Sequence, residues 1–151
     1  MNNSLNGQVA WITGGGSGIG LAGAIELARA GAHVVISGRN PETTLAAEKT
    51  LRTHGSAEAI LLDVADKHAV QRVAEQVLAK LGRIDILVNS AGINTRERSL
   101  DNISLDDWDN VIAINLSGLL RGARGAARHE VAWWRAHCQC GIVGGTASGT
   151  A

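Results

Sequence analysis

The sequence predicts an α/β protein with a doubly wound parallel sheet. Short apolar runs alternate with longer segments of helical periodicity, which is the pattern of a parallel sheet covered by helices on both faces. The first apolar run passes directly into a glycine-rich turn and then into a helical segment. With 151 residues, of which 45% are hydrophobic, the chain is long enough for one domain with a single core.

Four strands and three helices are expected to alternate along residues 8–92. Gly31 is suited to the end of the first helix, and Pro41 to the first turn of the second. The third helix, within residues 66–83, carries apolar residues along one face. Right-handed crossovers and the strand order 3-2-1-4 are expected, and in that order the ligand crevice lies at the carboxyl ends of strands one and four. The apolar runs that predict the strands are 8–14, 33–38, 57–64 and 84–92.

A further helix is expected to begin at Ser104. The serine hydroxyl is a suitable N-cap, and acidic residues follow it in the first turn. Helical spacing of apolar residues continues to Ala123. The residues expected to face inward are Trp108, Val111, Ile112 and Ile114.

Charge and composition limit the classes of partner. Fourteen basic and fourteen acidic residues leave no net charge, which gives no support to a nucleic-acid or anionic membrane partner. The polar opening residues lack the features of a secretory signal, and no apolar run approaches the roughly 18 residues that span a bilayer. A cytoplasmic protein with a small-molecule partner is expected. Cys138 and Cys140 are too close for an ordinary disulfide framework and too few for zinc, so no metal is expected.

The turn "TGGGSGIG", residues 13–20, joins the first strand to the first helix. Glycines in such a turn allow the backbone to approach a pyrophosphate, while the unpaired N–H groups and the helix dipole favour its negative charge. Glycines also occur in such turns for purely conformational reasons. The motif therefore needs the support of other residues.

Four motifs in the expected order resemble the short-chain dehydrogenases/reductases. The turn matches the Thr-Gly-x-x-x-Gly-x-Gly pattern of that family, "LLDV" its adenine-contacting pair, and "NSAG" its Asn-Asn-Ala-Gly signature. "NVIAINLSG" carries Asn115 at the position of the family's proton-relay asparagine. The resemblance, greatest to 3-oxoacyl-acyl-carrier-protein reductases, implies a Rossmann-type NAD(P)-binding fold that is incomplete here.

The resemblance also implies the cofactor-binding residues. Asp63 could alternatively cap a loop, and Asn89 could brace the neighbouring strands. The implied set is Thr13, Gly14, Ser17, Gly18, Ile19, Gly20, Ser37, Arg39, Asp63, Val64, Asn89, Ala91 and Gly92.

The end of the second strand favours NADP over NAD. In NAD-preferring members an acidic residue there accepts hydrogen bonds from the ribose hydroxyls. Gly38 occupies that position here, between Ser37 and Arg39, whose hydroxyl and guanidinium suit a 2′-phosphate. The alternatives are that Arg39 stacks on adenine or points to solvent, and that the cofactor is NAD.

The catalytic set of the family is nearly absent. The family reduces carbonyls or oxidises alcohols with a tyrosine whose pKa a nearby lysine lowers, and with a serine that binds the substrate oxygen. This sequence has no tyrosine and no lysine after Lys80, so Asn115 is the only member of the set that survives. Two functions therefore stay open: an oxidoreductase that is inactive as this chain alone, and an inert NADP-binding module. The resemblance also implies a homo-oligomer, but we do not expect one for this chain, because the helix that contributes to the family's interface is interrupted here.

Residues 129–140, "HEVAWWRAHCQC", fit no element of the family fold. If each codon is read one base later, Trp133 and Trp134 both become glycine, and residues 137–143 admit Ile-Val-Asn-Val-Ala-Ser-Ser. That reading restores the expected glycine turn and fifth strand with its serine. We therefore expect a frameshift, with residues 1–118 as the NAD(P)-binding half of a truncated enzyme and residues 119–151 as an out-of-frame tail.

Overall fold

A four-stranded parallel sheet forms the centre of the molecule. The computed structural model describes residues 4–96, 99, 101–118 and 121. The observed strand order is β3-β2-β1-β4, which confirms the expected order 3-2-1-4. The strands are β1 (Val9–Thr13), β2 (His33–Gly38), β3 (Ala57–Leu61) and β4 (Ile86–Asn89).

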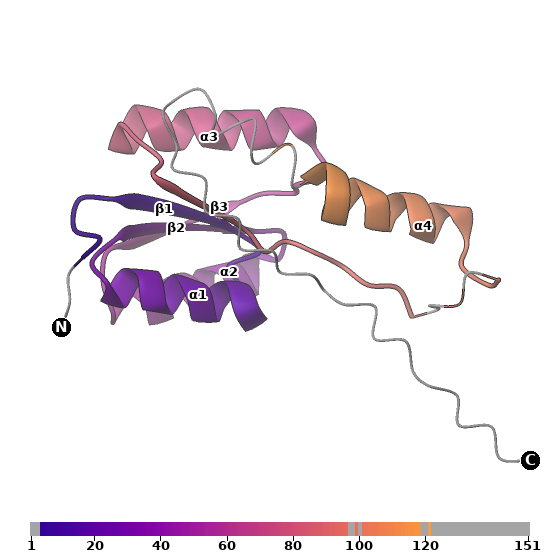
Figure 1. The fold of residues 1–151 in the computed structure, drawn as a ribbon, viewed down its shortest axis with the longest axis horizontal. Helices are drawn as coiled ribbons and strands as arrows, with labels where there is room; N and C mark the ends of the chain where they lie inside the picture. Colours follow the sequence, from indigo (N-terminus) through magenta and orange to yellow (C-terminus); the bar gives the residue numbers. More distant parts are fainter. Residues whose placement is uncertain (1–3, 97–98, 100, 119–120, 122–151) are drawn as a thin grey trace, which may run out of the picture.

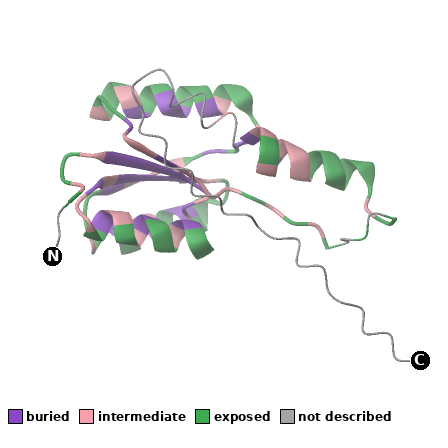
Figure 2. Cartoon of the chain, viewed as in Figure 1, coloured by how far each residue is buried: buried purple, intermediate pink, exposed green. Residues whose placement is uncertain are grey.

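Helices cover both faces of this sheet (Figure 1). α1 (Gly18–Arg29) and α2 (Pro41–Arg52) lie on one face, and α3 (Lys67–Leu81) lies on the other. Successive residues of β1 point to opposite faces, so Trp11 joins the core under α3 whereas Ile12 joins the core under α1 and α2. All five residues of β1 are buried, as expected for a central parallel strand, and the sheet interior in Figure 2 is correspondingly purple.

The helix boundaries follow from local side-chain chemistry. The Asn40 side chain accepts hydrogen bonds from two N–H groups at the start of α2, where Pro41 occupies the first turn. Asp66 caps α3 in the same way, and Gly82 ends that helix in the left-handed conformation, with φ 77°. Gly31, with φ 97°, follows the end of α1, as the sequence predicts.

The fourth helical region differs from the prediction. α4 (Leu105–Val111) begins after the Ser104 N-cap as expected, but it passes into a π-helical turn, η1 (Ile112–Ser117). No residue of α4 is buried and Trp108 is 44% exposed, so the inward orientation predicted for Trp108 is wrong. The reason is that α4 extends away from the sheet and only Ile114 reaches the core under α3 (Figure 1). The predicted tail, residues 119–151, lies outside the described residues apart from Arg121.

Two strands are shorter than their apolar runs. β3 ends at Leu61 because Asp63 accepts a hydrogen bond from the N–H of Ala65 and so begins a turn. β4 ends at Asn89 and forms one edge of the sheet within the described residues. None of the helices that the structure describes is long and apolar enough to cross a membrane.

Candidate functional site

A cavity of about 810 Å³ lies at the carboxyl ends of the strands. The turn after β1, the ends of β2 and β3, the loop after β4 and the η1 turn all contribute to it. The position is that of the expected ligand crevice, where the connections from β1 and β4 diverge. Its lining residues are Gly14, Gly16, Ser17, Ile19, Gly20, Gly38, Arg39, Asn40, Thr43, Thr44, Leu62, Val64, Ser90, Ala91, Gly92, Ile93, Ile114 and Asn115.

The glycine turn fits its surroundings only without side chains. Gly14 has φ 70°, and a Cβ atom there would lie 2.6 Å from the Cα atom of Ala91. A Cβ atom at Gly20 would overlap the carbonyl oxygen of Gly14, so helix α1 could not lie so close to the turn. The turn is also held to β2, because the N–H groups of Gly14 and Gly15 donate to the carbonyl oxygen of Ser37 at 2.7 and 3.2 Å. Gly14, Gly16 and Gly20 thus line one wall of the cavity with backbone atoms.

The start of α1 is the part of this wall best suited to an anion. Ser17 occupies the N-cap position, but its hydroxyl makes no capping hydrogen bond. The other three described α-helices have N-caps whose side chains accept backbone hydrogen bonds. Ser17 therefore keeps its hydroxyl available at the positive end of a 12-residue helix dipole.

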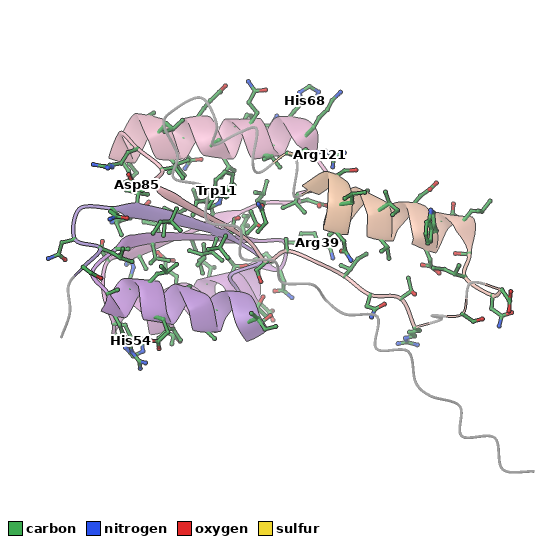
Figure 3. The ribbon with its side chains drawn as sticks, in the orientation of Figure 1. Trp11, Arg39, His54, His68, Asp85 and Arg121 are labelled. Atoms are coloured by element: carbon green, nitrogen blue, oxygen red, sulfur yellow. The ribbon has the colours of Figure 1, made fainter. Side chains whose placement is uncertain are left out.

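Arg39 is the only charged residue among the described residues that line the cavity. It is exposed and forms no ion pair with any described residue. Figure 3 shows it at the carboxyl end of the sheet, on the same side as Arg121. The cavity therefore has a positive charge with no carboxylate in its lining.

Thr13 and Ser37 do not line the cavity. Ser37 is 1% exposed, and its Oγ atom accepts a hydrogen bond of 3.1 Å from Nε1 of Trp11. Thr13 is equally buried, and its Oγ1 atom accepts from the N–H of Ala91 at 3.4 Å, which ties β1 to the loop after β4. Both residues lie behind the residues that line the cavity, and the buried Ser37 hydroxyl is not placed to bind a phosphate in the cavity.

Val64 lines the cavity and Asp63 does not. The carboxylate of Asp63 accepts from the N–H of Ala65 at 2.9 Å, which matches the loop-capping alternative for this residue. Gly18, with φ 55°, also lies outside the lining, although it connects Ser17 to the rest of α1.

Asn115 binds the backbone of the loop after β4. Its Oδ1 atom accepts from the N–H of Ile93 at 2.8 Å, and its Nδ2 atom donates to the carbonyl oxygen of the same residue at 2.9 Å. The side chain thus braces the loop that carries Ala91 and Gly92. Asn89 is different, because its buried Oδ1 atom has no hydrogen-bond partner within the described residues.

Several cavity residues were not expected from the sequence. Asn40, Thr43 and Thr44 come from the start of α2, and the "NP" pair at residues 40–41 is the signal that could have located them. A helix separated from the preceding parallel strand by only two residues starts at the carboxyl end of the sheet, where the crevice lies. No group of His, Cys, Asp and Glu side chains suited to a metal occurs in the described part of the chain. Cys138 and Cys140 lie outside it.

Together the sheet order, the glycine turn and the anion-compatible cavity define a Rossmann-type nucleotide-binding protein. A comparison with known proteins gives the family: the sequence profile of the short chain dehydrogenases matches residues 8–137. This chain belongs to the short-chain dehydrogenase/reductase family.

Similar proteins include several oxidoreductases. The chain is 45% identical over 115 residues to a D-threitol dehydrogenase of Mycolicibacterium smegmatis, covering 76% of this chain and 44% of that protein. It is 41% identical over 118 residues to the 3-oxoacyl-(acyl-carrier-protein) reductase FabG of Thermotoga maritima, with coverage of 76% and 47%. The chain spans about half the length of these curated relatives.

Solved structures agree with this assignment. A metagenomic short-chain oxidoreductase in complex with NADP matches with a TM-score of 0.78 and 38% sequence identity. The match covers 83% of this chain and 57% of that structure. The fold described here is therefore part of the fold of its solved relatives.

Proposed function

We propose that this chain binds NADP(H) in the cavity at the carboxyl ends of the strands. The observation that carries the proposal is the charge of the lining, in which Arg39 stands unpaired and no carboxylate is present among the described residues. NADP carries three phosphate groups, so a lining of this kind favours it. The relative solved in complex with NADP supports the same assignment.

The residues present fit the parts of the cofactor. Gly14, Gly16 and Gly20 line the cavity without side chains, which lets a pyrophosphate approach the backbone, and the free hydroxyl of Ser17 suits a pyrophosphate oxygen. Val64 supplies an apolar contact for adenine, while Ala91 and Gly92 lie on the side of the cavity nearer Asn115. When bound, NADPH would supply a hydride for the reduction of a carbonyl in the manner of the family.

NAD is the second candidate, and Gly38 weighs against it. The position that would carry an acidic residue for the ribose hydroxyls has no side chain here. A Cβ atom at Gly38 would also lie 2.7 Å from Oγ1 of Thr44, which donates to the carbonyl oxygen of Asn40. The packing at the start of α2 therefore disfavours any larger residue at this point.

A fluorescence titration tests the proposal. NADPH added to the purified 151-residue chain should show saturable binding, with quenching or shifting of the nicotinamide emission, and NADH should bind more weakly. Equal affinity for the two cofactors would contradict the assignment of NADP. No saturable binding of either would contradict the function itself.

For the chemical step, we propose that this chain alone does not catalyse turnover. It has no tyrosine to act as general acid and no lysine after Lys80 to lower a tyrosine pKa. Asn115, the one relay residue that is present, uses both atoms of its amide on Ile93. Oxidation of NADPH in the presence of small ketones and aldehydes, followed by absorbance, should not exceed the rate without protein. Turnover above that rate would restore the oxidoreductase alternative.

We further propose that residues 119–151 are translated out of frame. Support comes from the codon relation at Trp133 and Trp134, and from the fifth-strand sequence that the shifted frame admits at residues 137–143. The DNA sequence tests this directly. The shifted frame should continue downstream of codon 151 into a Tyr-x-x-x-Lys segment, and third-position bases that cannot encode the concealed strand would contradict it.

A further inference from the structure

A second cavity, of about 490 Å³, lies at the amino ends of β2 and β3, away from the nucleotide cavity. The parallel register pairs Val34 with Ala57 and so brings the preceding residues, His33 and Ser56, next to each other. Ser56 directly precedes β3, and Glu58 is the second residue of that strand. His33, Ser56 and Glu58 all line this cavity, together with Glu48, Arg52, Gly55, Ala57, Ala59 and Lys80.

Three of these side chains form a continuous chain of contacts. Oγ of Ser56 lies 2.7 Å from Nδ1 of His33, which is a hydrogen bond. On the other side of the ring, Nε2 of His33 lies 3.2 Å from Oε1 of Glu58. The second contact is not aligned as a linear hydrogen bond, and Nε2 has no other partner among the described residues. Such contacts are often loose in a catalytic site before the substrate binds.

Lys80 fixes the charge state of Glu58. Burial raises the pKa of the Glu58 carboxyl, but the hydrogen bond and charge of Lys80, together with His33, outweigh it and lower that pKa below its usual value. Nζ of Lys80 donates to Oε2 at 2.6 Å, which leaves Oε1 directed to His33. An ionised carboxylate beside Nε2 favours the tautomer with its hydrogen on that nitrogen. Nδ1 is then the acceptor for the hydroxyl proton of Ser56.

We propose that Ser56, His33 and Glu58 form a second reactive site that accepts acyl groups from activated esters. Ser56 is the nucleophile, His33 the general base, and Glu58 the positioning residue that orients the imidazole. Ser56 is exposed, so an ester carbonyl can reach its Oγ atom from the cavity. Arg52 also lines the cavity, where its Nε atom donates to the carbonyl oxygen of Ala57 at 3.2 Å and its Nη2 atom pairs with Oε1 of Glu48 at 2.7 Å.

The reaction balances without a cofactor. The Oγ atom of Ser56 forms a bond to the ester carbonyl carbon, and its proton passes to Nδ1 of His33. The bond to the alkoxy or aryloxy group then breaks, and that group leaves with the electron pair and takes up the proton. Water hydrolyses the acyl-serine to a carboxylic acid and free Ser56, again with His33 as the base.

Acetylation by p-nitrophenyl acetate tests this site in the full chain. Peptide mapping by mass spectrometry should find an acetyl group on Ser56 that hydroxylamine removes, because esters are cleaved by hydroxylamine and amides on lysine are not. His33→Gln should lower the rate of Ser56 acetylation by about 100-fold, the usual contribution of a general base. His54→Gln is the control. It removes a histidine from the turn just before Ser56, at the end of the sheet opposite Arg39 (Figure 3), and should leave the rate of Ser56 acetylation unchanged.

Several results would overturn the proposal. These are acetyl groups found only on amines, an unchanged Ser56 rate in His33→Gln, or p-nitrophenol release in Ser56→Ala equal to that of the unmodified chain. Ser56→Ala alters only an exposed side chain, so a circular dichroism spectrum like that of the unmodified chain separates loss of reactivity from loss of folding.

The role of Glu58 has its own measurement. Glu58→Gln removes the carboxylate that orients the His33 ring, so the rate of Ser56 acetylation should fall. Glu58→Asp keeps a carboxylate on this side of the ring and should restore part of the lost rate. An unchanged rate in Glu58→Gln, or an equal loss in both variants, would contradict the positioning role.

Discussion

Replacing Arg39 with alanine tests how the cavity distinguishes the two nicotinamide cofactors. Arg39 is exposed, lines the cavity and forms no ion pair with the described residues, so its removal leaves no buried partner behind. The fold should therefore tolerate the change. What is lost is the guanidinium that would meet the 2′-phosphate of NADP, a group that NAD lacks.

The expected size of the effect follows from this exposure. A hydrogen bond to a charged group contributes about 1.5–3 kcal/mol. Solvent at Arg39 screens the interaction, so the lower end of that range applies. Because about 1.4 kcal/mol corresponds to a tenfold change in affinity, Arg39→Ala should weaken NADPH binding about tenfold. NADH binding should stay within about twofold, which is less than 0.5 kcal/mol.

Isothermal titration calorimetry of both cofactors provides the assay. Arg29→Ala is the matched control, because Arg29 is also exposed and its removal changes the net charge equally, but it pairs with Glu26 at the far end of α1. Arg29→Ala should leave both affinities unchanged. If Arg39→Ala weakens NADH and NADPH binding equally, or leaves NADPH binding intact, the assignment of the 2′-phosphate to Arg39 is refuted.

Other variants separate the structural residues from the binding residues. Gly20→Ala should lower the free energy of unfolding by about 1–3 kcal/mol, because the added Cβ atom overlaps Gly14. Gly23→Ala in the same helix has open space around it and should raise the free energy of unfolding by up to about 1 kcal/mol. Equal effects of the two variants in chemical denaturation would contradict the close packing at Gly20. Ser37→Ala should lower the free energy of unfolding by about 1–3 kcal/mol, because Nε1 of Trp11 loses its buried partner. The ratio of NADPH to NADH affinity should not change in this variant, and a changed ratio would show that Ser37 contacts the cofactor. Burial raises the pKa of Asp85, but hydrogen bonds from Arg83 and the Val9 N–H outweigh it and hold that pKa below its usual value. Ionised Asp85 therefore stabilises the fold above about pH 4, and this stabilisation is lost as the pH falls through its lower folded-state pKa. In thermal melts below about pH 4, the melting temperature of Asp85→Asn should depend less on pH than that of the unmodified chain. Identical pH profiles of the two melting temperatures would argue against this role.

The sheet could be predicted because each of its elements has an unambiguous local signal. The apolar run at residues 8–14 is too short for a helix, and Gly31 ends α1 in a conformation that glycine adopts most easily. The strand order also followed from the sequence, since right-handed crossovers leave few arrangements for four parallel strands.

The fourth helical region shows where periodicity is insufficient. Trp108 recurs at helical spacing with Ile112, but spacing indicates only that two residues share a face, and the face of α4 that carries Trp108 has no layer against it in the described residues. Burial depends on the elements that pack against a helix, and these are not encoded in its own sequence.

The site was predicted in part for a related reason. Gly14, Ser17 and Arg39 could be located because a motif or a strand end placed them at the crevice. Ser37 was expected at the crevice because it lies near the end of β2. Side chains alternate between the two faces of the sheet along a strand, and the side chain of Ser37 points toward Trp11 instead. The contacts of Ser56 with His33 depend on strand register, which no motif at either residue indicates.

Amide chemical-shift mapping tests the central claim, that this chain keeps the nucleotide-binding half of a short-chain dehydrogenase/reductase. In a ¹H–¹⁵N spectrum, NADPH should shift the amides of Gly14–Gly20, Arg39 and Ala91–Gly92, while those of Glu58 and Lys80 at the opposite end of the sheet stay in place. Shifts confined to other regions, or none at cofactor concentrations that saturate related enzymes, would contradict the account.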